Sequence, residues 1–288
     1  MTSGASGLEI RQASVADFAV AVDWAAAEGW NPGLDDLAVF HAADPQGFYL
    51  GWLDGRPVSS ISVVRYGRDF GFLGFYIVHP EHRGTGAGLA TWNHGMAYLA
   101  DCTTVGLDGV VAQQDNYRRS GFVLAGRNVR RSGVPALDER TPRATIRPVT
   151  ADDLPALLAY DRTFFAGPRE VFTTAWTLPG GAARRALLAV ADGEMTGYGV
   201  IRKCRSGHKV GPLFAEDPAT AEALFVALCK TAPGEAVSLD TPEDNTAAVA
   251  LAERFGLAPA FETARMYRGP APELPLSRTY GITSFELG

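Results

Sequence analysis

Three closely spaced glycines lie where the sequence predicts a strand followed by a helix. Residues 81–90 read EHRGTGAGLA, with glycines at positions 84, 86 and 88 and a single arginine, Arg83, beside them. Glycine lets a ligand approach the main chain, and the first turn of a helix has N–H groups without partners inside the helix. Such a segment can hold a phosphate, with Arg83 adding a charge-assisted contact. A tight turn that binds nothing is the alternative interpretation.

The residue after the glycines excludes two common phosphate-binding motifs. A dinucleotide fingerprint that begins at Gly84 requires glycine at position 89, and a nucleotide P-loop requires lysine after its final glycine. Leu89 occupies that position. The pattern that remains is Arg83-x-x-Gly86-x-Gly88 after an aromatic-rich strand.

This pattern resembles the pyrophosphate-binding signature of the GCN5-related N-acetyltransferase (GNAT) family, Gln/Arg-x-x-Gly-x-Gly/Ala. The resemblance implies acetyl-CoA as cosubstrate and no metal. Loop amides would hold the pyrophosphate, and the preceding strand would pair with the pantetheine arm as another strand does. A main-chain amide near Phe75 or Tyr76 would polarise the thioester carbonyl. The positions it assigns to the coenzyme are Phe75, Tyr76, Ile77, Val78, Arg83, Gly84, Thr85, Gly86, Ala87 and Gly88.

A second segment, residues 117–122, resembles the family's Tyr-x-x-x-Gly-Phe motif. The resemblance implies that Tyr117 donates a proton to the departing thiolate, because a phenol within hydrogen-bond reach eases loss of the thiol. Packing of an aromatic ring on a helix is the alternative role. The sequence departs from the family upstream, where residues 113–116 replace the usual Asn and Ala of a longer helix.

Acidic and aromatic residues are the candidates for binding the acceptor. The family's usual reaction is direct attack of a free amine, and an amine that is protonated at neutral pH must first lose a proton. Asp108, which interrupts an apolar strand, is a candidate base or substrate anchor. A structural role is the alternative, because Asp240 stands at the corresponding place in the second half. Trp30, flanked by acids within residues 28–36, is the candidate aromatic contact for the acceptor.

The elements that position these residues occur twice in the chain. LEIRQASVADF resembles ATIRPVTADDL, each with a predicted N-cap (Ser14 or Thr150), at an offset of 136 residues. Each half continues with an Asp-Gly hairpin and a glycine-bearing strand that leads to a proline. We therefore predict a catalytic GNAT domain over residues 1–133, a linker over 134–143 and a second GNAT-like domain over 144–288.

Hairpins followed by a strand–helix–strand crossover predict an α/β (α+β) fold. Each domain is expected to be a mostly antiparallel twisted sheet flanked by helices, with the C-terminal tail adding a strand at a sheet edge. In the first copy we predict helices at 15–28, 34–43, 86–100 and 113–120. The predicted strands after the first are 47–53, 58–66, 70–79, 105–111 and 122–131.

The second copy lacks the residues that would bind a coenzyme. Residues 218–224 read PATAEAL, which has no glycine and contains Glu222, a residue that would repel phosphate. Ala252 stands where the first copy has Tyr117. The second domain is therefore expected to be degenerate, serving either to complete the acceptor pocket or to support the first domain.

Composition limits the partners and the compartment. The net charge is -6 without a basic stripe, which argues against nucleic acid. No apolar run approaches the roughly 20 residues that cross a bilayer, and the first residues do not resemble a secretory signal. The three cysteines have no metal-ligand spacing and indicate reduced thiols. We expect a cytoplasmic protein without a membrane partner, and no oligomeric state is predicted.

The expected function is acetyl-CoA-dependent N-acetylation of a primary amine of a small molecule, aminoglycoside-like or polyamine-like, by direct attack. The chain also resembles the kasugamycin-type aminoglycoside acetyltransferases and their relatives, through the segments EGWNPG, GFLGFYIV and GLDGVVAQ ahead of a degenerate second half. One alternative is an enzyme that acetylates a protein N-terminus or lysine. The other is a non-catalytic protein that binds acyl-CoA as a sensor.

Overall fold

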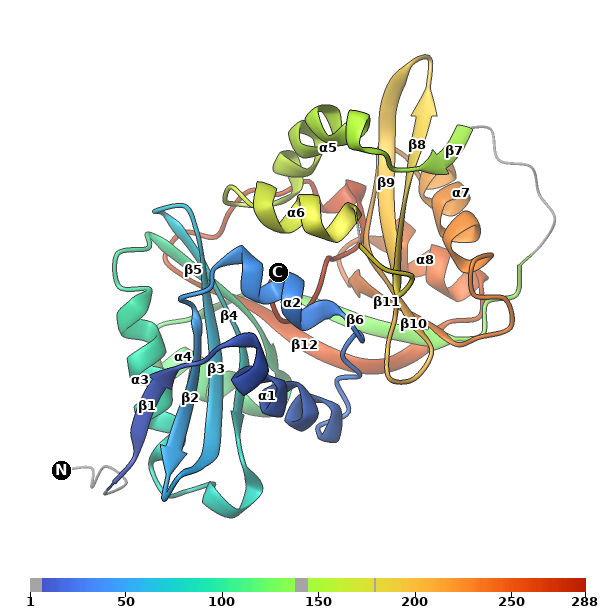
Figure 1. The fold of residues 1–288 in the computed structure, drawn as a ribbon. Helices are drawn as coiled ribbons and strands as arrows, with labels where there is room; N and C mark the ends of the chain where they lie inside the picture. Colours follow the sequence, from blue (N-terminus) through green and yellow to red (C-terminus); the bar gives the residue numbers. More distant parts are fainter. Residues whose placement is uncertain (1–6, 138–144, 179) are drawn as a thin grey trace.

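The computed structural model describes residues 7–137, 145–178 and 180–288. Two successions of strands and helices form the two lobes in Figure 1. The first contains β1 (Glu9–Gln12), α1 (Val15–Ala27), α2 (Asp36–Ala43), β2 (Phe48–Leu53), β3 (Arg56–Tyr66), β4 (Phe70–Val78), α3 (Ala87–Tyr98), β5 (Thr104–Val110), α4 (Gln114–Arg119) and β6 (Val123–Gly133). These bounds agree with the predicted elements to within about two residues.

The second half repeats the order of the first. It contains β7 (Thr145–Pro148), α5 (Leu154–Asp161), α6 (Glu170–Thr177), β8 (Arg184–Ala191), β9 (Glu194–Lys203), β10 (His208–Ala215), α7 (Pro218–Cys229), β11 (Val237–Pro242), α8 (Thr246–Arg254), β12 (Ala258–Arg268) and β13 (Thr279–Gly281). The predicted N-caps are confirmed, because Ser14 and Thr150 both form capping boxes with an aspartate three residues later. No helix in the described ranges has the length and apolar character needed to cross a membrane.

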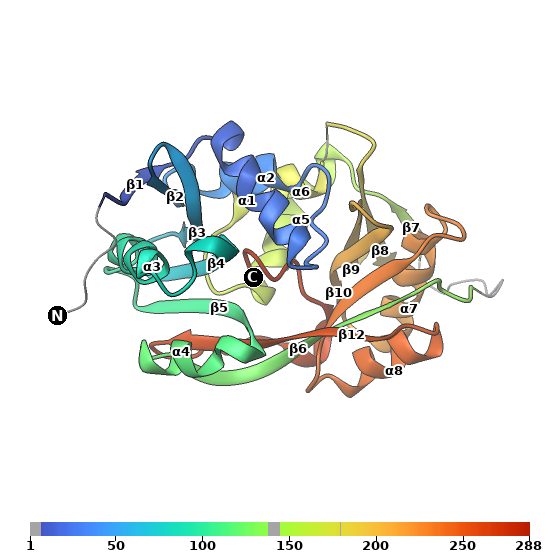
Figure 2. The ribbon, with the colours of Figure 1, turned by 90° about the horizontal axis from the view of Figure 1, so that it is seen from below.

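The two halves exchange their last long strands. The order along the sheet is β1-β2-β3-β4-β5-β12-β6-β11-β10-β9-β8-β7, so β12 lies between β5 and β6, and β6 lies between β12 and β11. Figure 2 shows β6 and β12 side by side where the two lobes meet. One mixed sheet therefore runs through both halves, and each half needs a strand from the other to complete its own part.

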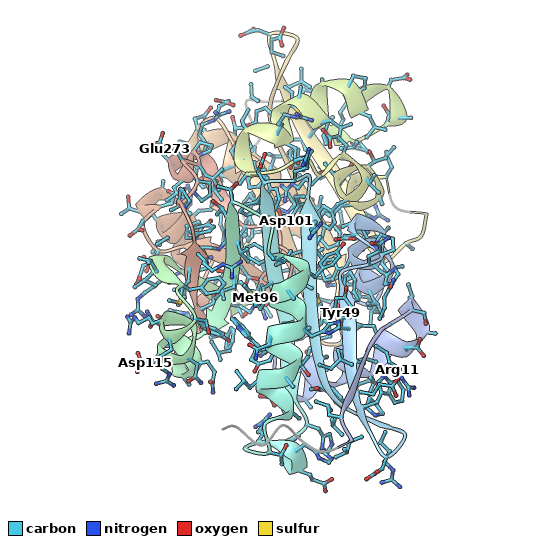
Figure 3. All side chains as sticks on the ribbon, turned by 90° about the vertical axis from the view of Figure 1, so that its left-hand side faces the viewer. Arg11, Tyr49, Met96, Asp101, Asp115 and Glu273 are labelled. Carbon is cyan, nitrogen blue, oxygen red and sulfur yellow. The ribbon has the colours of Figure 1, made fainter. Side chains whose placement is uncertain are left out.

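Helices cover both faces of the first half-sheet because side chains alternate along each strand. Phe48 and Leu50 pack with α1, whereas Tyr49 between them packs on the opposite face with residues of α3. Figure 3 shows α3, with Met96 labelled, lying across these strands. The site described below forms where β4 separates from β5, between these two helical layers.

The C-terminal tail takes a different path from the one predicted. Its strand, β13, covers only three residues and lies between β10 and β11 instead of at a sheet edge. Leu213 of β10 pairs with Gly281 of β13, and the Ile282 N–H donates to the carbonyl of Asp240 in β11 (2.9 Å). The following residues bring the C-terminus to the centre of the molecule (Figures 1 and 2).

Candidate active site

Strands β4 and β5 separate halfway along their length. Their parallel pairing runs from Phe70 opposite Thr104 to Leu73 opposite Leu107. Beyond that point β4 pairs on its other side with β3, through Ile77 and Val78. Its edge over residues 75–78 faces β5 without a strand partner in the described chain. A cavity of about 280 Å³ opens in this gap, and an extended ligand can add to such an edge.

A bulge marks the point where the strands part. Phe75 has a φ of +44°, a left-handed conformation that is unusual for a bulky residue. The register against β3 shifts between Ser60 and Ser62, and the Ser60 Oγ donates to the Phe75 carbonyl (2.7 Å). The Phe75 ring is buried against Phe18, with ring centroids 5.5 Å apart. Packing of the Phe75 ring therefore stabilises a backbone conformation that reorients the peptide groups where β4 and β5 separate.

The glycine loop joins the end of β4 to α3 and exposes main-chain donors. Gly84 and Gly86 have φ values of +79° and +91°, and Gly86 is the N-cap of α3 without a side-chain cap. In the described part of the chain, no acceptor receives the N–H groups of Gly84, Thr85, Gly86, Gly88 and Leu89. Unpaired donors at the positive end of a helix form an anion site.

Gly88 makes the closest contact between the loop and β4. A Cβ there would lie 2.7 Å from Val78 Cγ2 and 3.0 Å from the Tyr76 hydroxyl oxygen, so the position has no room for a side chain. Arg83 is at the rim, where its Nε donates to the Val78 carbonyl (3.0 Å) and its guanidinium pairs with Glu28. The residues assigned to the coenzyme are therefore contiguous along the loop and the open edge of β4.

Tyr117 lines the opposite wall of the cavity. Its ring stacks on Trp92 (centroids 5.7 Å apart) and lies over Gly109, where a Cβ would be 2.1 Å from the ring. Among the described residues the hydroxyl has no hydrogen-bond partner. Burial raises the pKa of Tyr117 well above its usual value, and neighbouring Tyr76 adds to the effect. The phenol is therefore a protonated donor throughout the neutral and mildly alkaline range.

Asp108 belongs to a buried ion pair. Its carboxylate accepts hydrogen bonds from Arg265 Nε (2.9 Å) and Nη2 (2.5 Å) of β12 and from Asn128 Nδ2 (2.8 Å) of β6. The Asp108 side chain has no exposed surface. It joins β5 to the two exchanged strands, and this geometry favours the structural alternative over a free base.

Residues of β6 and of the second half together hold the segment that carries Trp30. The Trp30 carbonyl accepts from Arg130 Nη1 and from Lys209 Nζ, both at 2.8 Å. Burial lowers the pKa of Lys209, and the positive charge of Arg130 lowers it further. Asp36, at the end of the segment, pairs with buried Arg202 (3.0 Å). These contacts are compatible with both roles considered for the second half, completion of the acceptor pocket and support of the first domain, because they fix the position of the loop that lines the cavity.

Four cavity residues that the sequence analysis missed come from the second half. They are Phe261 and Thr263 of β12, and Phe285 and Glu286 of the C-terminal tail. β12 reaches the site by strand exchange, and the tail reaches it after passing between β10 and β11. In the sequence, the one local indication that the tail belongs to a site is Glu286 beside Phe285 in the otherwise uncharged ending GITSFELG.

The corresponding gap in the second half is filled by the chain itself. β10 and β11 pair in parallel from His208 to Val210 and then separate, as β4 and β5 do. β13 occupies the gap that follows. α7 begins with Asp217 as N-cap, whose carboxylate accepts from the Thr220 N–H (2.9 Å). A carboxylate therefore lies where a phosphate would need to bind, in addition to the missing glycines.

Comparisons with known proteins agree with this architecture. Residues 11–122 match the acetyltransferase (GNAT) family, and residues 157–281 match an acetyltransferase (GNAT) domain. A holothin acyltransferase from Pseudoalteromonas sp. (strain SANK 73390) is 32% identical over 279 residues, which cover 96% of this chain and 94% of the relative.

Solved structures have the same fold. An acetyltransferase structure from Pyrococcus horikoshii superposes with a TM-score of 0.81 at 21% identity, covering 98% of this chain and 96% of that one. A tandem GNAT protein from the clavulanic acid biosynthesis pathway superposes with a TM-score of 0.64 at 17% identity, covering 92% and 100%.

Proposed function

The chain belongs to the GNAT acyltransferase family, and from this premise we propose that its first half acetylates a primary amine of a small molecule with acetyl-CoA. The observation that carries the proposal is the row of amides at residues 84–86, 88 and 89, which have no acceptor among the described residues, beside the open edge of β4. The second half has neither feature, because β13 fills its gap and Asp217 caps its helix. One coenzyme site per chain is the consequence.

The residues fit the coenzyme chemically. Gly84, Gly86 and Gly88 leave main-chain donors accessible to a diphosphate, and Arg83 adds a positive charge at the rim. The free edge of β4 over residues 75–78 would pair with the amide groups of pantetheine. Acetyl-CoA would supply an activated thioester, and main-chain amides near the bulge at Phe75 would polarise its carbonyl.

Tyr117 would assist departure of the sulfur. Because its pKa is raised, complete proton transfer to a thiolate is unfavourable, and its contribution is a hydrogen bond to the charge that develops on sulfur. The amine attacks directly in this account, without a covalent enzyme intermediate. Among the cavity-lining residues, the described chain offers no cysteine or serine as nucleophile.

The cavity favours a small acceptor over a protein chain. Phe261 and Thr263 of β12 and Phe285 and Glu286 of the tail line its acceptor side, and the whole cavity, including the coenzyme gap, has a volume of about 280 Å³. The relative named holothin acyltransferase makes holothin the first acceptor to test. Aminoglycosides and polyamines, the classes expected from the sequence, come next.

Release of free thiol from acetyl-CoA, measured with holothin, aminoglycosides, polyamines and short peptides, tests the proposal. Turnover with a small amine supports it, and a Gly88→Val variant should abolish that turnover. Turnover with peptides alone would establish the protein acetyltransferase alternative. Acetyl-CoA binding without turnover on any amine would favour a sensor.

A further inference from the structure

We propose that Glu286, contributed by the C-terminal tail, is the carboxylate that binds the acceptor amine and takes its proton. The proposal rests on the amine-acetylating function proposed above. It assigns the second half a direct part in the reaction, although that half cannot bind the coenzyme itself.

The tail places Glu286 beside the bulge of β4. Its main-chain carbonyl packs against Gly74, where a Cβ would lie only 2.1 Å from the Glu286 oxygen. Gly74 directly precedes Phe75, the residue at which β4 turns away from β5. Glu286 lines the same cavity as Tyr117, and only 4% of its surface is exposed. Glu286 is therefore a buried residue in the wall of the cavity that the coenzyme gap opens into.

Among the residues that the structure describes, the Glu286 carboxylate has no hydrogen-bond or ion-pair partner. Buried carboxylates are normally paired or hydrogen-bonded, because burial of an isolated charge is costly. Glu286 accepts no hydrogen bond from any described residue, yet neither of its oxygens is sealed from the cavity. An acceptor ammonium entering the cavity would supply the missing partner.

The cations near Glu286 are committed to other acceptors. Arg130 donates to Asp240 from Nε and Nη2, both at 2.7 Å, and Arg202 donates to Asp36. Lys209 donates to the Trp30 carbonyl. These positive charges lie close enough to feel Glu286 electrostatically. They offset the free-energy cost of burying the Glu286 carboxylate but form no hydrogen bonds with it.

The other acids that line the cavity are already paired. Asp108 is enclosed by Arg265 and Asn128, and Glu28 pairs with Arg83 at the rim. Glu286 is the remaining acidic residue among the described residues of the lining.

The tail is anchored on both sides of Glu286. The Thr283 Oγ1 accepts from Arg169 Nη1 (3.0 Å), and the Leu287 carbonyl accepts from the Tyr66 hydroxyl (3.0 Å). The Leu287 N–H donates to the Ser284 Oγ (3.0 Å). A carboxylate held between such contacts is preorganised, so little entropy is lost when it receives an amine.

The proposed step balances in atoms and charge. The ammonium of the acceptor gives one proton to Glu286, and the resulting free amine attacks the acyl carbon. The N–C bond forms, the C–S bond breaks, and the electron pair leaves with sulfur. The second proton lost by nitrogen ends on sulfur as a thiol, and the proton on Glu286 returns to solvent. Trp30, Phe261 and Phe285 would surround the body of the acceptor, which favours a compact amine with an apolar part.

Benzylamine is a suitable probe because it combines one ammonium group with a flat apolar body. We would titrate it calorimetrically into CoA-loaded wild type, Glu286→Gln and Glu286→Asp. Glu262→Gln is the matched control, since Glu262 lies on β12 between two cavity residues but pairs with Arg127 outside the cavity. The acetylation rate with the best amine of the panel is measured on the same proteins.

Glu286→Gln should weaken benzylamine binding at least tenfold and lower kcat/KM about 100-fold, a typical contribution of a general base. Acetyl-CoA affinity should not change, and Glu262→Gln should behave as wild type. Glu286→Asp keeps the charge on a shorter side chain, so its kcat should fall about tenfold. If Glu286→Gln does not fold, the kcat of Glu286→Asp tests the role of Glu286 instead.

Equal benzylamine affinity in wild type and Glu286→Gln would overturn the proposal. So would a wild-type kcat in Glu286→Asp, or no benzylamine binding to the CoA-loaded wild type. Absence of turnover by wild type with every amine is a different result, because it refutes the proposed function while the binding measurement still decides the role of Glu286.

Discussion

Replacing Tyr117 with phenylalanine removes one hydroxyl group and leaves the aromatic packing intact. The ring would still stack on Trp92 and lie over Gly109. The hydroxyl has no hydrogen-bond partner in the described chain, so its removal breaks no internal contact. We expect the free energy of unfolding to change by less than about 1 kcal/mol.

The effect on catalysis follows from the hydrogen bond that is lost. A hydrogen bond to a charged group contributes about 1.5–3 kcal/mol. If it forms only as the thiolate departs, its removal should lower kcat about 10- to 150-fold and leave the affinity for acetyl-CoA unchanged. Because burial raises the pKa of Tyr117, wild-type kcat should show no loss from ionisation of this phenol between pH 7 and about 9.

Thiol release at saturating acetyl-CoA and amine gives kcat for this comparison. Tyr49→Phe is the matched control, because Tyr49 is also buried against α3 but lies outside the cavity. A Tyr117→Phe kcat within twofold of wild type would refute the assigned role. An equal fall in the Tyr49 variant would show that the effect is structural.

Three further outcomes are expected. Gly88→Val would collide with Val78 and cover the loop amides, so calorimetry should show at least a tenfold loss of CoA affinity. Asp108→Ala would leave the part-buried Arg265 without its carboxylate partner, and urea denaturation should show a loss of about 3 kcal/mol in the free energy of unfolding, the lower end for a fully buried pair. Burial opposes ionisation of Asp240, but Arg130 outweighs it and lowers the pKa. The stability from this pair should be present above about pH 4 and decline as pH falls towards the lowered pKa, in urea titrations that use Asp240→Asn as reference.

Local signals were sufficient to predict the elements of the first half. Ser14 caps α1, and Gly84 and Gly86 adopt the left-handed conformations that glycine permits. The apolar run of Phe48, Tyr49 and Leu50 is typical of a buried strand, and in the structure its side chains pack alternately on the two faces of the sheet. The loop, the strand edge and Tyr117 could be assigned to one site because their motifs resemble those of the GNAT family and occur in the same order along the chain.

The exchange of strands and the path of the tail could not be predicted in this way. The residue patterns of β6 and β12 are compatible with several neighbouring strands. Packing of the whole core determines which strand each of them pairs with. The role of Asp108 was obscured for the same reason, because its partner Arg265 is 157 residues away. Glu286 is a lone acid in a short tail, and its position in the cavity depends on contacts with both halves.

We expect the first half to bind one CoA and the second half to bind none. Calorimetric titration of CoA into the full chain tests this expectation through the stoichiometry. One site per chain is predicted, and it should be lost in Gly88→Val. Two sites per chain, no binding by wild type, or an undiminished site in Gly88→Val would contradict it.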